Sequence, residues 1–544
     1  MSNQYSTQTL DHLGIVAGVC QQVGLIEQID ARVPDTGRTV SVGQAVQAMV
    51  LNGLGFVGRP LYLTPEFYRT KPLDLLVGTG IEADDLNGDS LGKALDHLYQ
   101  AGITEIFAAV SAHALKVYGI AVRFAHLDTT AFSVEGAYEE DGQQDEEESQ
   151  PIRITYGYSK DHRPDLKQAI LGLICANRTC IPAYLNALSG NVADKTSLPE
   201  MARLYLDQFA AEEETPVLVA DSALYSADTI QDLSTVLWVT RVPATLRKAK
   251  RVLMETAQEE MTASEREGYF YHETTSAYGG VAQRWLVVLY APRREQELVQ
   301  LNRRIERERD DLAKSLQKLA RQRFSCAEDA QQALAQYAKQ WSFHTVTGEL
   351  YASERYRQPG RPTSDSAKIT AWHIRGTFQR DEKAIIAQQK PLGKYIIATN
   401  ELDKDKQPAE ALLTVYKDQN RSVERGFRFL KDPLFFASRF FLKKPARIMG
   451  LLMVMGLSLL VYALAEHQLR QQLAEREQSI PDQKGRATQR PTMRWVFQLF
   501  EGIHVLCIQA QEFQKRMVTN VREIHLQIAT LLGEPVLKFY VFSQ

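Results

Sequence analysis

The feature that most constrains the fold of this chain is a short uninterrupted apolar run, VLVA at residues 217–220, which ends on Asp221. A run of this length without polar alternation is typical of a strand covered on both faces, as in a parallel sheet between helices. The segment SALYSADTIQDLS then opens a helix, with Ser226 or Asp228 as its N-cap. Ligands in open α/β sheets gather at the carboxyl ends of strands, so Asp221 stands where a site is expected.

A second acid, Asp128, lies in a segment that also has the character of a strand. The residues AVRFAHLDTTAF (121–132) are rich in Val, Phe and Thr, and charge occurs only at Arg123 and Asp128. This composition predicts a central strand. A single Asp at a strand end is more often a turn or cap residue, so neither aspartate is sufficient evidence of a site by itself.

The third acid, Glu424, lies in the segment NRSVERGFRFLKDP (420–433), whose spacing predicts a helix with two stripes. The charged stripe consists of Arg421, Glu424, Arg428 and Lys431, and the apolar stripe of Val423, Phe427, Leu430 and Leu434. The helix would pack by its apolar stripe and present one carboxylate within a row of cations. The alternative is an ordinary i, i±4 ion pair on a solvated helix face.

Two strand acids and one helix acid, far apart in sequence, can together form an oxygen-rich pocket for divalent metal. Such a pocket activates water or a 3′-hydroxyl against a phosphodiester. The joint occurrence of Asp128, Asp221 and Glu424 therefore indicates a metal site more strongly than any one of these acids does alone.

With these three acids the chain resembles DDE transposases of bacterial insertion sequences, in the insertion sequence four superfamily. That group carries the signature Tyr-x2-Arg-x3-Glu-x6-Lys around its last acid, and Glu424 with Lys431 matches the Glu-x6-Lys half. The other half departs from the signature, because Asn420 and Lys417 stand where Arg and Tyr are expected. Three nearby residues at shifted spacing are substitutes for that half: Tyr416, Gln419 and Arg421. The segments 157–168 (GYSKDHRPDLKQ) and 490–504 (RPTMRWVFQLFEGIH) are also similar to one branch of these transposases.

The resemblance implies an RNase H-like catalytic core in which Asp128, Asp221 and Glu424 bind two Mg²⁺ ions, with Mn²⁺ as a substitute. It implies cleavage of double-stranded DNA at the terminal inverted repeats and joining of the 3′-hydroxyl ends to target DNA, by a homodimer on DNA. The DNA-contacting residues would be Tyr416, Gln419, Arg421, Arg428 and Lys431. Two alternatives remain: a metal-dependent nuclease of the same fold without strand transfer, and an inactive DNA-binding relic.

Composition is consistent with this function. The chain has 44% apolar and 24% charged residues and a net charge of −3, which argues against a uniformly basic DNA-coating protein. Charge is unevenly distributed, however: residues 135–150 hold eight acids and no Lys or Arg, whereas residues 421–447 hold eight Lys or Arg and two acids. A neutral chain can thus offer phosphates a positive face.

The cysteines and the apolar segments predict a cytoplasmic protein without a membrane span. Five cysteines without a CxxC indicate neither a zinc ribbon nor a disulfide framework, and Cys175 and Cys180 are expected to bracket a hairpin turn. The uncharged stretch 450–465 is shorter than the roughly 20 residues that a membrane-spanning helix needs, and it is expected to form a buried helix against the sheet. We therefore expect a cytoplasmic protein, and the resemblance to bacterial transposases implies association with the bacterial nucleoid when the protein binds DNA.

The predicted fold is α/β, with an RNase H-like core, a helical N-terminal domain and a large insertion before the last acid. Residues 1–118 are predicted to form a helical domain that binds DNA ends, although a protein-interaction bundle suits them nearly as well. Within this region Ser41 and Gln44 are predicted to form a capping box. Gly102 is predicted to end one helix, and Thr104 to cap the next. The remaining predicted regions are the first part of the core (119–245), an inserted β-plus-long-helix subdomain (246–400), the second part of the core with the Glu424 helix (401–470) and a C-terminal helical or extended region (471–544). Within the core we expect an acidic disordered loop at 136–150 and a strand at RITYGYS. Within the insertion we expect a long amphipathic helix within 293–341 and a Pro/Gly linker at 358–364.

Overall fold

The computed structural model describes residues 4–34, 37–56, 60–136, 138, 151–158, 163–209, 215–356, 368–433, 442–509 and 514–542. Within it the chain forms two compact units. The first unit comprises residues 1–240, 278–281 and 411–544, and the second comprises residues 241–277 and 282–410. Most of the predicted acidic loop (139–150) and the whole predicted linker (358–364) lie outside the described residues.

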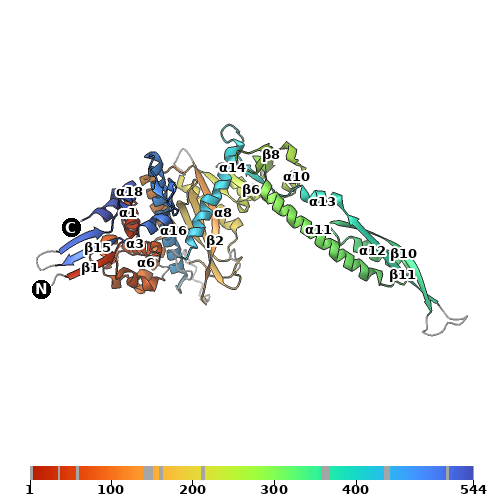
Figure 1. The fold of residues 1–544 in the computed structure, drawn as a ribbon, viewed down its shortest axis with the longest axis horizontal. Helices are drawn as coiled ribbons and strands as arrows, with labels where there is room; N and C mark the ends of the chain where they lie inside the picture. Colours follow the sequence, from red (N-terminus) through yellow and green to blue (C-terminus); the bar gives the residue numbers. More distant parts are fainter. Residues whose placement is uncertain are drawn as a thin grey trace. The chain divides into compact units, whose positions relative to one another are not determined.

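The central sheet of the first unit has the strand order β4-β3-β2-β5-β6. Its strands β2 and β6 are labelled in Figure 1. Its strands are β2 (Phe124–Val134), β3 (Lys167–Ala176), β4 (Pro182–Ser189), β5 (Val217–Ala220) and β6 (Trp238–Val242). Strands β2, β3 and β4 pair antiparallel, whereas β5 is parallel to both β2 and β6. Helix α8 (Asp194–Leu206) precedes β5 and helix α9 (Ala227–Asp232) follows it. This order of strands and helices is the RNase H-like order, so the predicted α/β fold class is confirmed.

Local sequence explains most of these elements. The apolar run 217–220 forms β5 with three of its four residues buried, and Ser226 caps α9 by accepting a hydrogen bond from the Thr229 amide at 3.2 Å. Cys175 and Cys180 bracket the turn between β3 and β4, as predicted.

The segment RITYGYS was expected to form a strand, and this prediction is wrong. Within residues 153–158 only Thr155 forms a bridge, to Gln168 at the start of β3. The backbone hydrogen bonds of the segment are divided between two partners, because the Arg153 carbonyl accepts from the Gly190 amide at 3.0 Å whereas the Thr155 carbonyl accepts from the Gln168 amide at 2.9 Å. The segment therefore lies against the β3–β4 hairpin without extending its ladder.

The N-terminal part of the first unit is helical. Its helices are α1 (Leu13–Gln22), α2 (Leu25–Asp30), α3 (Val42–Leu54), α4 (Thr64–Tyr68), α5 (Leu73–Leu76), α6 (Gly88–Ala101) and α7 (Ile103–Val117). Ser41 and Gln44 form the predicted capping box of α3. The prediction for Thr104 is wrong: Gly102, at φ 92°, both ends α6 and precedes α7, so Thr104 lies inside α7.

Helix α16 (Pro445–Glu475) is the central helix of the first unit and packs against α1, α3, α6, α7 and β4. It is long and apolar enough to cross a membrane by composition, and most of its apolar stretch is buried within the protein, as in the core helix of a globular protein. The predicted buried helix at 450–465 is confirmed. It approaches the sheet closely, because a Cβ on Gly456 would lie 2.4 Å from Leu185 of β4.

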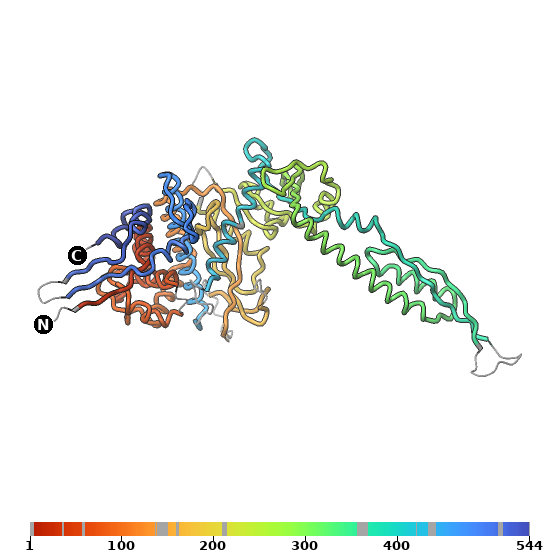
Figure 2. The backbone as a smooth tube through the Cα atoms, in the orientation of Figure 1, coloured from red at the N-terminus to blue at the C-terminus, as the bar shows by residue number. Residues whose placement is uncertain are grey.

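The two ends of the chain meet in the first unit. Strand β1 (Gln4–Thr9) pairs antiparallel with β15 (His504–Gln509), which also pairs with β16 (Gln514–Thr519) (Figure 2). The remaining C-terminal elements are β13 (Ile480–Pro481), β14 (Ala487–Thr488), α17 (Met493–Leu499), α18 (Glu523–Leu531) and α19 (Glu534–Val541). The N-terminal helices, the sheet and the C-terminal region thus form one compact body.

The second unit contains a sheet portion and a helix-plus-ribbon portion. Its strands follow the order β12-β9-β8-β7, with β7 (Thr262–Ala263), β8 (Tyr269–Tyr278), β9 (Val281–Tyr290) and β12 (Lys394–Thr399). The other elements are α10 (Arg247–Glu255), α11 (Ala291–Ala320), α12 (Ala327–Ala338), the antiparallel pair β10 (His344–Tyr356) and β11 (Lys368–Arg380), and α13 (Glu382–Gln389). The predicted long amphipathic helix is α11, and its apolar stripe packs against α12, β10 and β11.

Candidate active site

Asp128 and Asp221 lie on neighbouring parallel strands of the central sheet. The register between β2 and β5 pairs Ala125 with Leu218 and His126 with Val219. The pairing ends at His126 and Val219, so Asp128 and Asp221 each follow the last pair by two residues, at the same end of two adjacent strands. Both aspartates are half-buried. The sheet therefore brings together two carboxylates separated by more than ninety residues of sequence.

Each aspartate is also oriented by the backbone next to it. Asp128 Oδ1 accepts a hydrogen bond from the Thr129 amide at 2.7 Å, and Asp221 Oδ1 accepts one from the Ala223 amide at 2.8 Å. Thr240 of β6 donates its hydroxyl to the Asp221 carbonyl oxygen at 2.6 Å. Asp221 is thus a capping residue as well as a candidate site residue, and the two roles are compatible because a carboxylate has two oxygens.

Glu424 lies near the start of α15 (Val423–Leu430), an eight-residue helix that packs on β2 and β3. Val423, Phe427 and Leu430 are buried as predicted, while Glu424 is exposed; Leu434 of the predicted stripe lies outside the described residues. The connection before α15 consists of α14 (Ala409–Asp418) and the short helix η6 (Gln419–Arg421).

Two contacts show that α15 lies over the face of β2 that carries Asp128. Side chains alternate along a strand, so His126, Asp128 and Phe132 share one face. The Lys431 ammonium, just after α15, lies 5.7 Å from the centre of the Phe132 ring. At the other end a Cβ on Gly426 would lie 3.9 Å from the sulfur of Cys175, which pairs with His126 in the β2–β3 register. The Glu424 helix and Asp128 are therefore on the same side of the sheet.

Two buried groups close to Asp128 on this side of the sheet, His126 and Cys175, are uncharged at neutral pH. Burial lowers the pKa of His126 to about 4. Burial, assisted by Cys180 and Asp128, raises the pKa of the Cys175 thiol well above its usual value. Asp128 therefore has a neutral imidazole and a neutral thiol as buried neighbours.

The donor chemistry fits a hard divalent cation, because all three candidate ligands offer carboxylate oxygen. Their present arrangement is a pair with a third acid on an adjacent helix. Within the described part of the chain, no three His, Cys, Asp or Glu side chains are grouped so that they could hold a metal ion. Strand pairing thus brings Asp128 and Asp221 to the same end of adjacent strands, whereas Glu424 is placed on the same face without joining them in a three-residue cluster.

The five residues predicted to contact DNA are placed differently from one another. Arg421 and Arg428 are exposed, and Tyr416 and Lys431 are half-buried. Gln419 departs from expectation, because it is 5% exposed and donates its amide to the Leu127 carbonyl at 3.2 Å. Its side chain attaches η6 to β2 beside Asp128, and we leave it out of the DNA-contacting set.

Asp194, the first residue of α8, is a polar neighbour of the site that the sequence interpretation missed. Its Oδ1 accepts a hydrogen bond from the Thr129 hydroxyl at 2.5 Å. Thr129 follows Asp128 on β2 and so faces the other side of the sheet, where α8 packs. The available signal was an acid at the first turn of the predicted helix DKTSLPEMARLYLDQFA, which reads as an ordinary helix start.

Comparison with known proteins identifies the class. A family model described as a transposase DDE domain matches residues 127–462, a range that contains Asp128, Asp221 and Glu424. This match covers more than half of the chain, so the protein belongs to the transposase DDE domain family: it is a transposase, an enzyme that acts on DNA. A second model, described as a domain of unknown function (DUF4277), matches residues 5–112.

The comparisons with solved structures and with curated proteins do not assign the chain to any further family. Among solved structures, a piggyBac transposase synaptic complex with hairpin DNA is similar with a TM-score of 0.38 and 8% sequence identity, over 91% of this chain and 82% of that chain. No curated protein matches the sequence.

Proposed function

We propose that this protein is the transposase of a bacterial insertion sequence in the insertion sequence four superfamily. It cleaves double-stranded DNA at the terminal inverted repeats of its element and joins the 3′-hydroxyl ends to target DNA. The observation that supports the proposal is the parallel pairing of β2 and β5, which brings Asp128 and Asp221 to the same end of adjacent strands in a chain of the transposase DDE domain family. Helix α15 supports it by holding Glu424 over the same face of the sheet.

The proposed metal ligands are Asp128, Asp221 and Glu424. When bound, two Mg²⁺ ions, or Mn²⁺ in their place, would lower the pKa of an attacking water or 3′-hydroxyl and stabilise the leaving oxygen. The protein contributes two carboxylates fixed by strand pairing and by the Thr129 and Ala223 amides. Glu424 is supplied from the helix, on the solvent side where DNA approaches.

Cationic side chains next to Glu424 are proposed to position phosphates. Arg421 and Arg428 are exposed on the stripe that carries Glu424, and Lys431 ends it. Guanidinium groups suit this role because they bind phosphate oxygens in a bidentate manner. Replacing Lys431 with Ala should weaken DNA binding and flatten its salt dependence more than it affects folding.

Three further parts of the proposal come from the resemblance to these transposases. The enzyme works as a homodimer that bridges two element ends, it contacts DNA ends with its N-terminal helices, and it is located in the bacterial cytoplasm. Tyr416 is retained as a DNA contact near the scissile bond.

The test is cleavage of a labelled duplex that carries the terminal repeat of the element, in Mg²⁺, followed by a strand-transfer assay with a pre-cut 3′-end. Wild type should cut at the repeat end and join the pre-cut end to target DNA. Glu424→Gln, Asp128→Asn and Asp221→Asn should each abolish both steps while retaining binding to the duplex. Asp228→Asn is the matched control, because Asp228 is an exposed acid just beyond Asp221 and should behave as wild type.

The other outcomes distinguish the alternatives. Cleavage without joining would identify a nuclease of the same fold, and binding without cleavage by wild type would identify an inactive relic. Equal cleavage by wild type and Glu424→Gln would show that Glu424 is not the third acid.

A further inference from the structure

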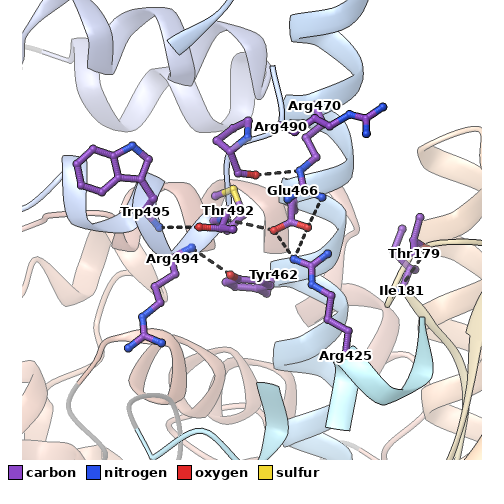
Figure 3. Close-up of polar contacts among 12 residues, drawn as sticks. Thr179, Ile181, Arg425, Tyr462, Glu466, Arg470, Arg490, Thr492, Arg494 and Trp495 are labelled. Carbon is purple, nitrogen blue, oxygen red and sulfur yellow. Dashed lines mark hydrogen bonds and ion pairs between the residues drawn. The ribbon is translucent and has the colours of Figure 1, made fainter. Parts of the chain in front are cut away.

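Glu466 of α16 is a buried carboxylate at the junction of three segments. It follows the uncharged stretch 450–465 and is 3% exposed. Arg425 of α15 donates to both of its oxygens, at 2.5 Å and 2.7 Å, and Arg470 of α16 lies 2.8 Å from Oε1 (Figure 3). The Met493 amide, at the start of α17, donates to Oε2 at 3.3 Å. A buried charge requires such pairing, because an isolated one would be strongly destabilising.

Arg425 is the residue next to the proposed catalytic Glu424. Successive residues of a helix point about 100° apart, so fixing the direction of Arg425 fixes the direction of Glu424. The neighbouring Gly426 lets α15 approach α16, since a Cβ there would lie 3.0 Å from Leu459. The Glu466–Arg425 contact and this close approach together determine the rotation of α15 about its own axis.

The far end of α15 is also attached to the C-terminal segment. Asp432, two residues after the helix, accepts a hydrogen bond from Arg494 of α17 at 3.1 Å. A helix of eight residues has little stability of its own, so such contacts decide where it lies.

The C-terminal segment is itself held on α16 by backbone contacts. Arg470 donates its Nε to the Pro491 carbonyl at 2.9 Å, and the Arg494 amide donates to the Tyr462 hydroxyl at 3.0 Å (Figure 3). These contacts give a structural role to the segment RPTMRW at 490–495, which the sequence interpretation singled out and the proposed function does not use.

We infer that Glu466 is a positioning residue of the transposase: by binding Arg425, it sets the rotation of α15 and places Glu424 over β2. The inference rests on the proposed function only in taking Glu424 as the third acid. Glu466 does not touch DNA or metal. Arg470 and the segment 490–495 complete the buried site around Glu466.

The test compares Glu466→Gln with wild type in three measurements. These are the single-turnover cleavage rate on the terminal-repeat duplex, the dissociation constant for that duplex, and amide hydrogen exchange of α15. Glu466→Gln should cut at least about tenfold more slowly, because misplacing a reacting group by about 1 Å can cost as much as about a hundredfold. Its dissociation constant should stay at the wild-type value, and exchange in residues 423–430 should accelerate while α9 keeps its protection.

Two further variants control for general loss of structure. Glu466→Asp keeps the charge and should restore part of the cleavage rate. Glu475→Gln, at the exposed end of the same helix, should match wild type in all three measurements. If Glu466→Gln fails to fold, Arg425→Met replaces it, because that variant leaves Glu466 paired with Arg470.

Wild-type cleavage and wild-type exchange of α15 in Glu466→Gln would overturn the inference. So would a cleavage loss matched by equal loss of protection throughout the first unit, since that result indicates general destabilisation. Failure of the proposed function is separate: wild type would not cleave, yet faster exchange confined to α15 would still establish that Glu466 positions this helix.

Discussion

Protonation of His12 should destabilise the first unit as the pH falls below 6.5. His12 precedes α1 and is 4% exposed; its Nε2 donates to the Leu54 carbonyl at 2.8 Å, and its ring stacks on Phe497 with centroids 4.3 Å apart. Its Nδ1 is buried without a hydrogen-bond partner among the described residues, so a second proton there would have no acceptor. Burial, with a contribution from Lys71, accordingly lowers the pKa of His12 from 6.5 to about 4.

The sign and size of the change in stability follow from the difference between the pKa of His12 in the unfolded chain and in the folded protein. The unfolded chain takes up the proton as the pH falls through 6.5, whereas the folded protein resists until about pH 4. The free energy of unfolding is therefore unaffected above pH 6.5 and decreases between these two values. For one such group the loss is about 1.4 kcal/mol at pH 5.5 and about 3 kcal/mol below pH 4.

The assay is urea unfolding at pH 7.5 and pH 5.5, monitored by the loss of amide protection in α1 and α3. His12→Gln keeps a donor for Leu54 but cannot take up a proton, so its stability should fall by about 1.4 kcal/mol less than that of wild type between the two pH values. His113→Gln, a half-buried histidine of the same unit, serves as the control. Identical pH dependence in wild type and His12→Gln would refute the reasoning.

Three other predictions concern packing and thiol reactivity. Tyr540→Phe should lower the free energy of unfolding by about 1–3 kcal/mol in a urea titration, because the buried hydroxyl donates to the Asp11 carbonyl and accepts from the Ile15 amide; an unchanged midpoint would contradict this. Gly18→Val should destabilise by at least about 1–3 kcal/mol in the same titration, because even a Cβ would lie 2.7 Å from the backbone of Val536 in α19; wild-type stability would show that α1 and α19 are not in close contact. A thiol reagent should modify two cysteines in the native protein, as measured by mass spectrometry after partial reaction. Early labelling of any of the three other cysteines would contradict the observed packing. The two reactive residues are the half-buried Cys326 and Cys507, whereas burial raises the pKa of Cys20, Cys175 and Cys180.

The candidate site was predictable in its parts and not in its assembly. Asp128 and Asp221 could be placed on strands because each lies in a segment with a strong local hydrophobic pattern. The helix around Glu424 was predictable for the same reason, and its apolar stripe is buried as far as the structure describes it. The direction of Gln419 was not predictable, because its position in a short 3-10 turn follows from contact with β2 and not from helical spacing.

The sequence alone determined the RNase H-like order of elements, the long apolar helix and the long amphipathic helix, because each of these depends on periodicity within one short segment. Only the tertiary structure decided the β2–β5 pairing that brings the two aspartates to the same end of adjacent strands. It also decided that Glu466 meets Arg425 across forty residues of sequence. Strand register and buried ion pairs join segments that are distant along the chain, so they follow from how all the elements pack together and leave no signal in the sequence around either partner.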